Sequence, residues 1–153
     1  MTLNDLLSPQ CVAFDIRARD KRSAIEAVAS AAARQLDLPP KEVLDAVLAR
    51  EAKGSTGFGG GVAIPHGRIE GLGRVVGYFA RLASPVDFDS VDGVPVDLVF
   101  LLLAPESATA AHLKALARVS RLFRDAELRA SLRKANSPDA LFVLADAARI
   151  RAA

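Results

Sequence analysis

The sequence predicts an α/β layered domain, and three observations support this prediction. The N-terminal part of the chain holds one short strand pattern followed by two helical patterns. The middle contains segments dense in β-branched and apolar residues, which are typical of buried strands. From Ser107 onward the pattern is helical. Strands and helices in this order are expected to pack as layers around one core.

The composition predicts a single domain spanning residues 1–153. The chain has 153 residues, of which 51% are hydrophobic and 25% charged, as in ordinary globular proteins. The net charge of +2 is too small to favour nucleic acid or a membrane surface as a partner. No apolar segment approaches the roughly 20 residues of a transmembrane helix, and the polar start of the chain does not resemble a signal peptide. We therefore expect a cytoplasmic location.

The first elements are predicted as a strand and two helices. Gln10–Ile16 alternates enough to form a strand. Asp20 is a suitable N-cap for a helix whose apolar residues recur at spacings of three and four. Pro39-Pro40 ends that helix and starts the next one, since proline is tolerated in a first turn. We expect this second helix to run to Arg50, with Gly54 closing it.

The later elements are two strands and a series of helices. Val75–Leu82 is rich in β-branched and aromatic residues, and Val96–Leu103 is almost continuously apolar, as in a central strand buried on both faces. Ser84–Pro95 between them carries turn residues. Three helical segments follow, at Ala110–Arg124, Glu127–Ala135 and Asp139–Arg149.

A glycine-rich stretch, GSTGFGGGVAIPHGR, runs from Gly54 to Arg68. Glycine lets another backbone or a ligand approach closely, so five glycines between Gly54 and Gly61 indicate a shaped loop. His66 follows a short apolar run and is expected at a strand end, exposed and held in one direction. The stretch fits neither the P-loop nor the Rossmann spacing, which argues against a nucleotide cofactor.

The chain has two histidines, His66 and His112, and they are the strongest candidates for chemistry. A neutral imidazole with a pKa near ~6.5 can attack phosphorus at cell pH without a strong base. With Thr109 as N-cap, His112 becomes the third residue of a helix, where the dipole disfavours a charged ring and free N–H groups attract anions. Arg50 precedes the glycine loop and could contact phosphate oxygens. His66 is our candidate phosphate-accepting nucleophile.

Each of these features also has a structural interpretation. A glycine-rich loop is often only a turn, and a lone histidine is more often packed or solvated than reactive. Two histidines fall short of a zinc site even if Cys11 is added, so we expect no metal, and Cys11 is expected as a buried hydrophobe. Aspartates at positions 87, 89 and 92 lie in turn sequence, where they are common for local reasons. The residues alone support an α/β domain with a candidate histidine site.

Arg50-Glu51 followed by GSTGFGGGVAIPHGR resembles the active-site signature of the EIIA components of the bacterial phosphotransferase system. The resemblance is to the fructose/mannitol superfamily and especially to its nitrogen-regulatory branch, EIIA-Ntr. It continues through Val94–Leu98 and the run from His112 to Asp125, and it covers nearly the whole chain. It implies a three-layer α/β/α sandwich, in which helices flank a central mixed β-sheet.

The resemblance also implies roles for individual residues. His66 falls on the phosphorylated histidine, His112 on the second active-site histidine, and Arg50 on the arginine near the phosphate. The phosphoryl group would pass from phosphoenolpyruvate through Enzyme I and a small HPr-like carrier. Phe58 stands where we expect an aliphatic residue, and we expect Phe58, Val62 and Ile64 to form the docking patch for that carrier. No cofactor is implied.

Three functions follow as hypotheses. Nitrogen-type members resemble switches, whose phosphorylation state changes their binding to targets such as potassium transport proteins and sensor kinases. Sugar-type members pass the phosphoryl group to an EIIB for sugar uptake. This chain has no fused EIIB, EIIC or carrier domain, which favours the regulatory phosphocarrier over a metabolic enzyme. A binding module whose histidine is never phosphorylated is the third hypothesis.

Overall fold

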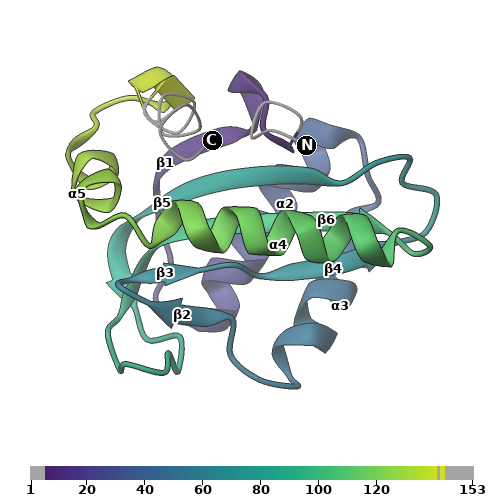
Figure 1. Ribbon diagram of the computed structural model, residues 1–153, viewed down its shortest axis with the longest axis horizontal. Coiled ribbons are helices and arrows are strands. Elements are labelled where there is room, and N and C mark those ends of the chain that lie inside the picture. Colours follow the sequence, from purple (N-terminus) through teal and green to yellow (C-terminus); the bar gives the residue numbers. More distant parts are fainter. Residues whose placement is uncertain (1–5, 141, 144–153) are drawn as a thin grey trace.

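In the computed structural model, which describes residues 6–140, 142 and 143, helices cover both faces of a mixed sheet (Figure 1). The strands are β1 (Val12–Ile16), β2 (Gly57–Gly59), β3 (Val62–Ala63), β4 (His66–Ile69), β5 (Val76–Val86) and β6 (Val96–Pro105). The helices are a short 3-10 helix η1 (Pro9–Cys11), α2 (Lys21–Leu36), α3 (Pro40–Glu51), α4 (Thr109–Phe123) and α5 (Ala126–Lys134). This confirms the predicted three-layer arrangement.

Strand β6 organises the sheet. It pairs antiparallel with β5 on one side and parallel with both β3 and β4 on the other. Strand β1 then runs parallel to β5, and β2 runs antiparallel to β3. Every residue from Leu98 to Ala104 is buried, as expected for a strand covered by helices on both faces. The prediction of a central buried strand in this part of the chain is confirmed.

Strands β3 and β4 lie end to end along the same edge of β6. Val62 pairs with Leu98, and His66 pairs with Leu102 four residues further along β6. Pro65 separates the two strands because it has no N–H to donate, yet its carbonyl still accepts the N–H of Leu102 at 3.0 Å. The register of the central strand therefore determines where His66 lies.

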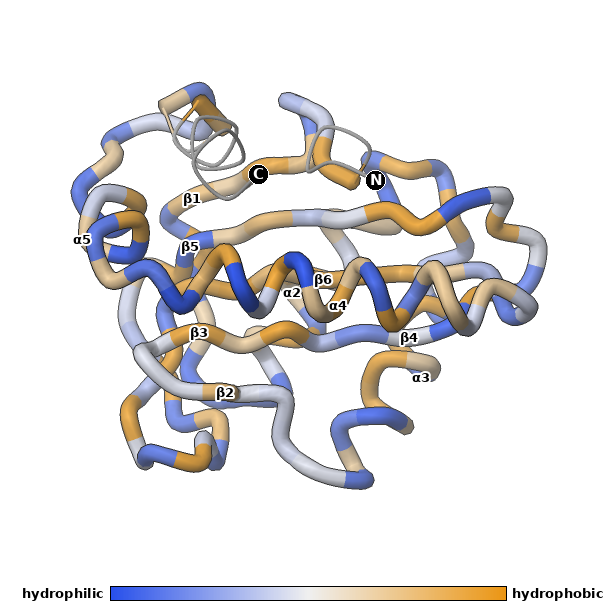
Figure 2. Tube along the Cα trace, in the orientation of Figure 1, coloured by the Kyte–Doolittle hydropathy of each residue, from blue (hydrophilic) through white to orange (hydrophobic). Residues whose placement is uncertain are grey.

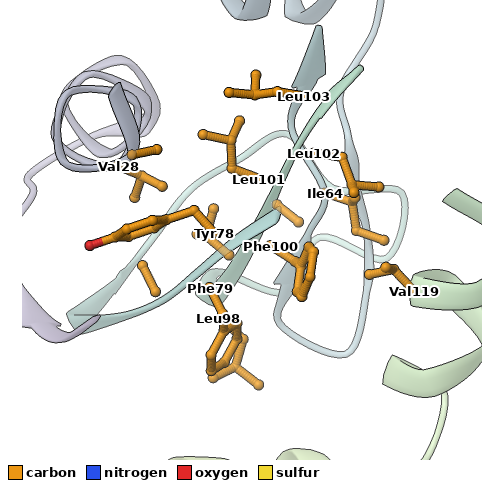
Figure 3. Close-up of a cluster of buried hydrophobic side chains, with 14 of the residues drawn as sticks. Val28, Ile64, Tyr78, Phe79, Leu98, Phe100, Leu101, Leu102, Leu103 and Val119 are labelled. Carbon is orange, nitrogen blue, oxygen red and sulfur yellow. The ribbon is translucent and has the colours of Figure 1, made fainter. Parts of the chain in front are cut away.

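The hydrophobic core lies on both faces of the sheet (Figure 3). On one face, the rings of Phe79, Phe100 and Phe123 have centroids 5.7–6.3 Å apart and join β5 and β6 to the end of α4. On the other face, α2 packs through Val28 and its neighbours, and α3 packs on α2 and β4. Apolar and polar residues alternate along α4, as a helix half-covered by a sheet requires (Figure 2).

Several predicted boundaries are confirmed and others are wrong. Asp20 caps α2 as predicted, by accepting the N–H of Ser23 in a capping box. The first strand begins at Val12 and not at Gln10, because Pro9 starts a 3-10 helix. Helix α3 extends to Glu51 with Ala52 as its C-cap, so Gly54 is not the residue that closes it.

The C-terminal part also differs from expectation. Ala108, with no side-chain cap, precedes α4, so Thr109 is its first residue and not its N-cap. The predicted helix Asp139–Arg149 lies mostly outside the described residues. Among the residues that the structure describes, no helix is long and apolar enough to cross a membrane.

Truncating a ring of the aromatic cluster is expected to reduce the stability of the protein strongly. Replacing Phe100, which is 1% exposed, with alanine leaves a cavity between β6 and α4. We expect Phe100→Ala to lower the free energy of unfolding by about 3–5 kcal/mol in urea titrations. Val91→Ala is the control, since Val91 is 92% exposed and its truncation should change stability by less than about 0.5 kcal/mol. Equal effects of the two substitutions would contradict this description of the core.

Candidate functional site

His66 is the first residue of β4, at the edge of the sheet. Side chains alternate along a strand, so His66 and Arg68 share one face and Gly67 takes the other. A β-carbon at Gly67 would lie 3.1 Å from the Cβ of Ala46 and 3.3 Å from the backbone nitrogen of Val47. Glycine at this position therefore allows the backbone of α3 to pack tightly against β4, which brings the end of α3 close to the imidazole.

The structure brings the two histidines together, although they are 46 residues apart in the chain (112 minus 66). Their ring centroids are 5.2 Å apart, and the ring planes meet edge to face at 78°. His112 is the fourth residue of α4, and its N–H already donates to the carbonyl of Ala108 at 2.9 Å. Its backbone N–H is thus not available to an anion, contrary to our expectation. The side chain is the part of His112 that faces the site.

The hydrogen bond made by His66 determines its tautomer. Nδ1 lies 2.9 Å from the carbonyl oxygen of Ile64. A carbonyl only accepts hydrogen bonds, so Nδ1 carries the proton when the ring is neutral. The lone pair of that neutral ring is then on Nε2. Nε2 is consequently the nitrogen that can act as a nucleophile.

Both imidazoles favour the neutral form. Burial lowers the pKa of His66, and the nearby guanidinium of Arg50 lowers it further, against the Ile64 hydrogen bond and the charge of Glu51, which raise it. Burial also lowers the pKa of His112, with added contributions from His66 and Arg68. His112 is only 6% exposed, and its Nε2 has no hydrogen-bond partner among the described residues. A buried nitrogen without a hydrogen-bond partner favours the binding of a ligand that can form that hydrogen bond.

An open pocket of about 540 Å³ lies beside the two rings. It is lined by residues of α3, β4 and α4, namely Ala46, Ala49, Arg50, Lys53, His66, Gly67, Arg68, His112, Leu113 and Leu116. Three of these residues are cations and none is an acid, so the pocket is suited to an anion. Arg50 donates to the carbonyl of Gly54 at 2.9 Å, which fixes one side of its guanidinium at the start of the glycine loop.

The glycine loop is held by side chains from distant parts of the chain. Arg133 of α5 donates to the carbonyl of Gly60 at 2.6 Å and pairs with Asp97 at 2.9 Å. Asp92 accepts the N–H of Gly60 at 3.0 Å. Gly61 has a φ of +79°, and a β-carbon there would collide with the guanidinium of Arg133. The glycines therefore allow the chain to form a tight, shaped loop, as predicted.

Glu51 is a buried residue of this region for which no role was predicted from the sequence. It is 7% exposed and accepts hydrogen bonds from the backbone and the hydroxyl of Thr56. Lys21 lies 2.9 Å from the same carboxylate. The sequence did contain a signal, because Glu51 follows Val43 and Val47 at spacings of four and so falls on the buried face of α3.

The predicted docking patch is wrong for two of its three residues. Val62 and Ile64 are 0% and 4% exposed and belong to the core, so their side chains cannot meet a partner. Phe58 is partly buried against the core and does not line the pocket, and its docking role stays a prediction. Leu113 was missed. It is 62% exposed, lines the pocket and directly follows His112 in α4.

The structure also shows the surroundings of the other residues weighed as sites. Among the described residues, no group of three or more His, Cys, Asp or Glu side chains could hold a metal ion. Cys11 is free and buried, as predicted for a small hydrophobe. Asp87 and Asp92 accept backbone N–H groups of Asp89 and Val94, which confirms the predicted local role for these two residues, and Asp92 has a second role through its bond to Gly60.

The chain belongs to a known family of phosphoryl carriers. Residues 5–146 match the family described as the phosphoenolpyruvate-dependent sugar phosphotransferase system, EIIA 2. This match extends beyond the signature around His66 and takes in every described strand. The fold and the family together define the protein as an EIIA-type phosphocarrier.

Within this family, the chain is similar to nitrogen regulatory proteins. It is 44% identical to the Nitrogen regulatory protein of Bradyrhizobium diazoefficiens over 93% of both chains. It is 41% identical to that of Escherichia coli, over 93% of this chain and 88% of the other. The structure of Nitrogen Regulatory Protein IIA-Ntr from Neisseria meningitidis superposes with a TM-score of 0.86 at 36% identity, covering 94% of this chain and 98% of that one. The predicted resemblance to the nitrogen-regulatory branch is confirmed.

The two neutral histidines predict a pH dependence of stability. Both folded-state pKa values lie below the ordinary value of 6.5, so below that pH the unfolded chain binds protons that the folded protein does not. The free energy of unfolding should therefore fall as the pH drops through the ordinary value of 6.5, and level off below the folded-state pKa values. Urea titrations of the wild type and of a His66→Gln/His112→Gln double variant measure this. A double variant with an unchanged slope would contradict the assignment.

Proposed function

We propose that this protein accepts a phosphoryl group on Nε2 of His66 and regulates target proteins through its phosphorylation state. One observation carries the proposal: Nδ1 of His66 is committed to the Ile64 carbonyl, while Nε2 keeps its lone pair in a ring whose lowered pKa favours the neutral form. The pocket that His66 lines contains three cations and no acidic side chain. Membership of the EIIA 2 family supports the same chemistry.

The transfer step follows from this tautomer. The Nε2 lone pair of His66 forms a new N–P bond while the N–P bond of the carrier's phosphohistidine breaks. The electron pair of the broken bond returns to the carrier's ring nitrogen, and the proton on Nδ1 of His66 stays in place. The phosphorylated ring becomes more positive, and the carbonyl of Ile64, 2.9 Å from Nδ1, stabilises that charge.

His112 and Arg50 are proposed to bind the oxygens of the phosphoryl group. Nε2 of His112 is buried and has no partner among the described residues, so with the proton of the neutral ring on Nε2 it would donate to a phosphoryl oxygen. The guanidinium of Arg50 can contact a phosphate through two N–H groups, and it is anchored at the rim of the pocket by Gly54. Both groups would stabilise charge as the phosphoryl group moves.

The donor is proposed to be an HPr-like carrier, itself phosphorylated by Enzyme I from phosphoenolpyruvate. Such a carrier must bring its own histidine to Nε2 of His66, so it must dock over the pocket. Leu113 offers an exposed apolar contact there, and Lys53 and Arg68 offer charge at the rim. Phe58 is a further candidate contact. We propose that the whole chain, residues 1–153, acts as one EIIA domain.

The regulatory output is proposed from the similarity to nitrogen regulatory proteins over most of both chains. A phosphoryl group adds about −1.5 to −2 charge to a pocket that is otherwise positive. That change alters which partners can bind without refolding the domain. Potassium transport proteins and sensor kinases are the proposed classes of target, in the cytoplasm.

Labelling tests the acceptor directly. Incubation with phosphoenolpyruvate, Enzyme I and the HPr-like carrier should add one acid-labile phosphate per chain to the wild type and none to His66→Ala. His66→Gln is a second variant that keeps a side chain of similar size. Mass spectrometry counts the phosphate. Retention of the label in both variants would contradict the proposal.

The two oxygen-binding residues predict a loss of rate. His112→Ala and Arg50→Met should each slow phosphoryl transfer to His66 by about 10²-fold, the usual cost of removing one donor to a developing charge. Rapid-quench kinetics with the phosphorylated carrier measures this rate. Arg22→Met is the matched control, because Arg22 lies on α2 and pairs with Glu26, away from the pocket. A wild-type rate in both site variants would remove the assigned roles.

The alternative function is a sugar-specific EIIA of the fructose or mannitol type. The same His66 chemistry would then serve sugar uptake, with an EIIB as the acceptor. Candidate EIIB proteins mixed with the phosphorylated chain would distinguish the two functions. Transfer to an EIIB within seconds would favour sugar uptake, and a phosphate that stays on the chain while a target binds would favour regulation.

A further inference from the structure

Glu51 joins the end of α3 to the glycine loop through buried polar contacts. Its Oε1 accepts the backbone N–H of Thr56 at 2.9 Å, and its Oε2 accepts the Thr56 hydroxyl at 2.6 Å. The ammonium of Lys21, at the start of α2, lies 2.9 Å from Oε1. A buried carboxylate is costly to desolvate unless it is paired. These contacts therefore fix Glu51 and Thr56 relative to each other.

Two further hydrogen bonds continue from Thr56 to the imidazole. The carbonyl of Thr56 accepts the N–H of Ile64 at 3.0 Å. The carbonyl of Ile64 in turn accepts from Nδ1 of His66 at 2.9 Å. The carboxylate of Glu51 is thus connected to the ring through two residues, with a hydrogen bond at each step.

We propose that Glu51 is a positioning residue for His66: by holding Thr56 it holds the Ile64 carbonyl, which keeps the proton on Nδ1 and the lone pair on Nε2. The effect on phosphoryl transfer rests on the proposed function, whereas the effect on the tautomer does not. Glu51 itself does not line the pocket beside His66. Its charge raises the pKa of His66, but it reaches the Ile64 carbonyl through Thr56.

The glycine content of the loop explains why such an anchor is needed. Between Glu51 and Ile64 the chain contains five glycines, which are free to take many backbone conformations. At Thr56 this segment is hydrogen-bonded to Glu51, the last residue of α3. Lys21 also lies 5.5 Å from the ring centroid of Phe88, and Ser55 donates to the carbonyl of Phe88, so the loop before β6 is joined to the same anchor.

The test compares the tautomer of His66 in variants of the anchor. Nitrogen NMR of the ring distinguishes a protonated Nδ1 from a protonated Nε2. In the wild type above the pKa of His66 we expect a single species with the proton on Nδ1. In Glu51→Ala we expect a mixture of both tautomers. Phosphoryl uptake from the HPr-like carrier should then slow about tenfold, with the half-saturating carrier concentration unchanged, because orientation and not docking is lost.

A conservative pair keeps the test independent of folding failure in Glu51→Ala. Thr56→Val removes the hydroxyl group that donates a hydrogen bond to Oε2 of Glu51, and it preserves the shape of the side chain. Thr56→Ser keeps the hydroxyl. We expect Thr56→Val to shift the tautomer in the same direction as Glu51→Ala, though less far, and Thr56→Ser to match the wild type.

An effect of general destabilisation must be distinguished from a loss of the orientation of His66. Leu82→Ala is the control, because Leu82 is buried in β5 and pairs with Ile16 of β1, on the side of β6 opposite to β3 and β4, so its truncation destabilises the protein away from the anchor. We expect it to leave the tautomer and the uptake rate unchanged. A single Nδ1–H tautomer in both Glu51→Ala and Thr56→Val overturns the proposal, and so does an equal loss of that tautomer in Leu82→Ala. Failure of the wild type to accept phosphate would contradict the proposed function, and the tautomer would still decide the role of Glu51.

Discussion

The hydrogen bond between Nδ1 of His66 and the carbonyl of Ile64 determines which nitrogen of the ring can react. Ile64 lies in the short break between β3 and β4, and His66 is the first residue of β4. Their position depends on the pairing of Val62 with Leu98 and of His66 with Leu102 along β6. The most deeply buried strand of the sheet thus positions a side chain at its edge. A reactive group benefits from this arrangement, because rigid elements position it better than a free loop does.

His66 must be buried enough to favour the neutral ring and exposed enough for a second protein to reach it. Partial burial keeps the imidazoles neutral by lowering the pKa of each, and the nearby cations act in the same direction. Those cations would also attract the dianionic phosphoryl group that we propose His66 accepts. A more buried His66 could not be reached by a second protein. A fully exposed one would be protonated more readily near neutral pH and would lose its lone pair.

The site was predicted from sequence more completely for its reactive groups than for their surroundings. His66, His112 and Arg50 line one pocket, as the resemblance implied. Val62 and Ile64 were expected at the surface because they adjoin His66 in the chain. Adjacency in sequence says little about exposure, however, since both side chains pack into the hydrophobic core. Glu51 was missed because a charged residue is usually exposed.

The α/β class, the central apolar strand and the candidate nucleophile could all be predicted from the amino-acid sequence. Hydrophobic periodicity and a long, specific motif are local properties of the chain, so no coordinates are needed to recognise them. Only the tertiary structure decided the 5.2 Å approach of the two rings, the proton position on His66 and the burial of Glu51. These depend on contacts between residues distant in the chain and on backbone direction after Pro65, which no local pattern specifies.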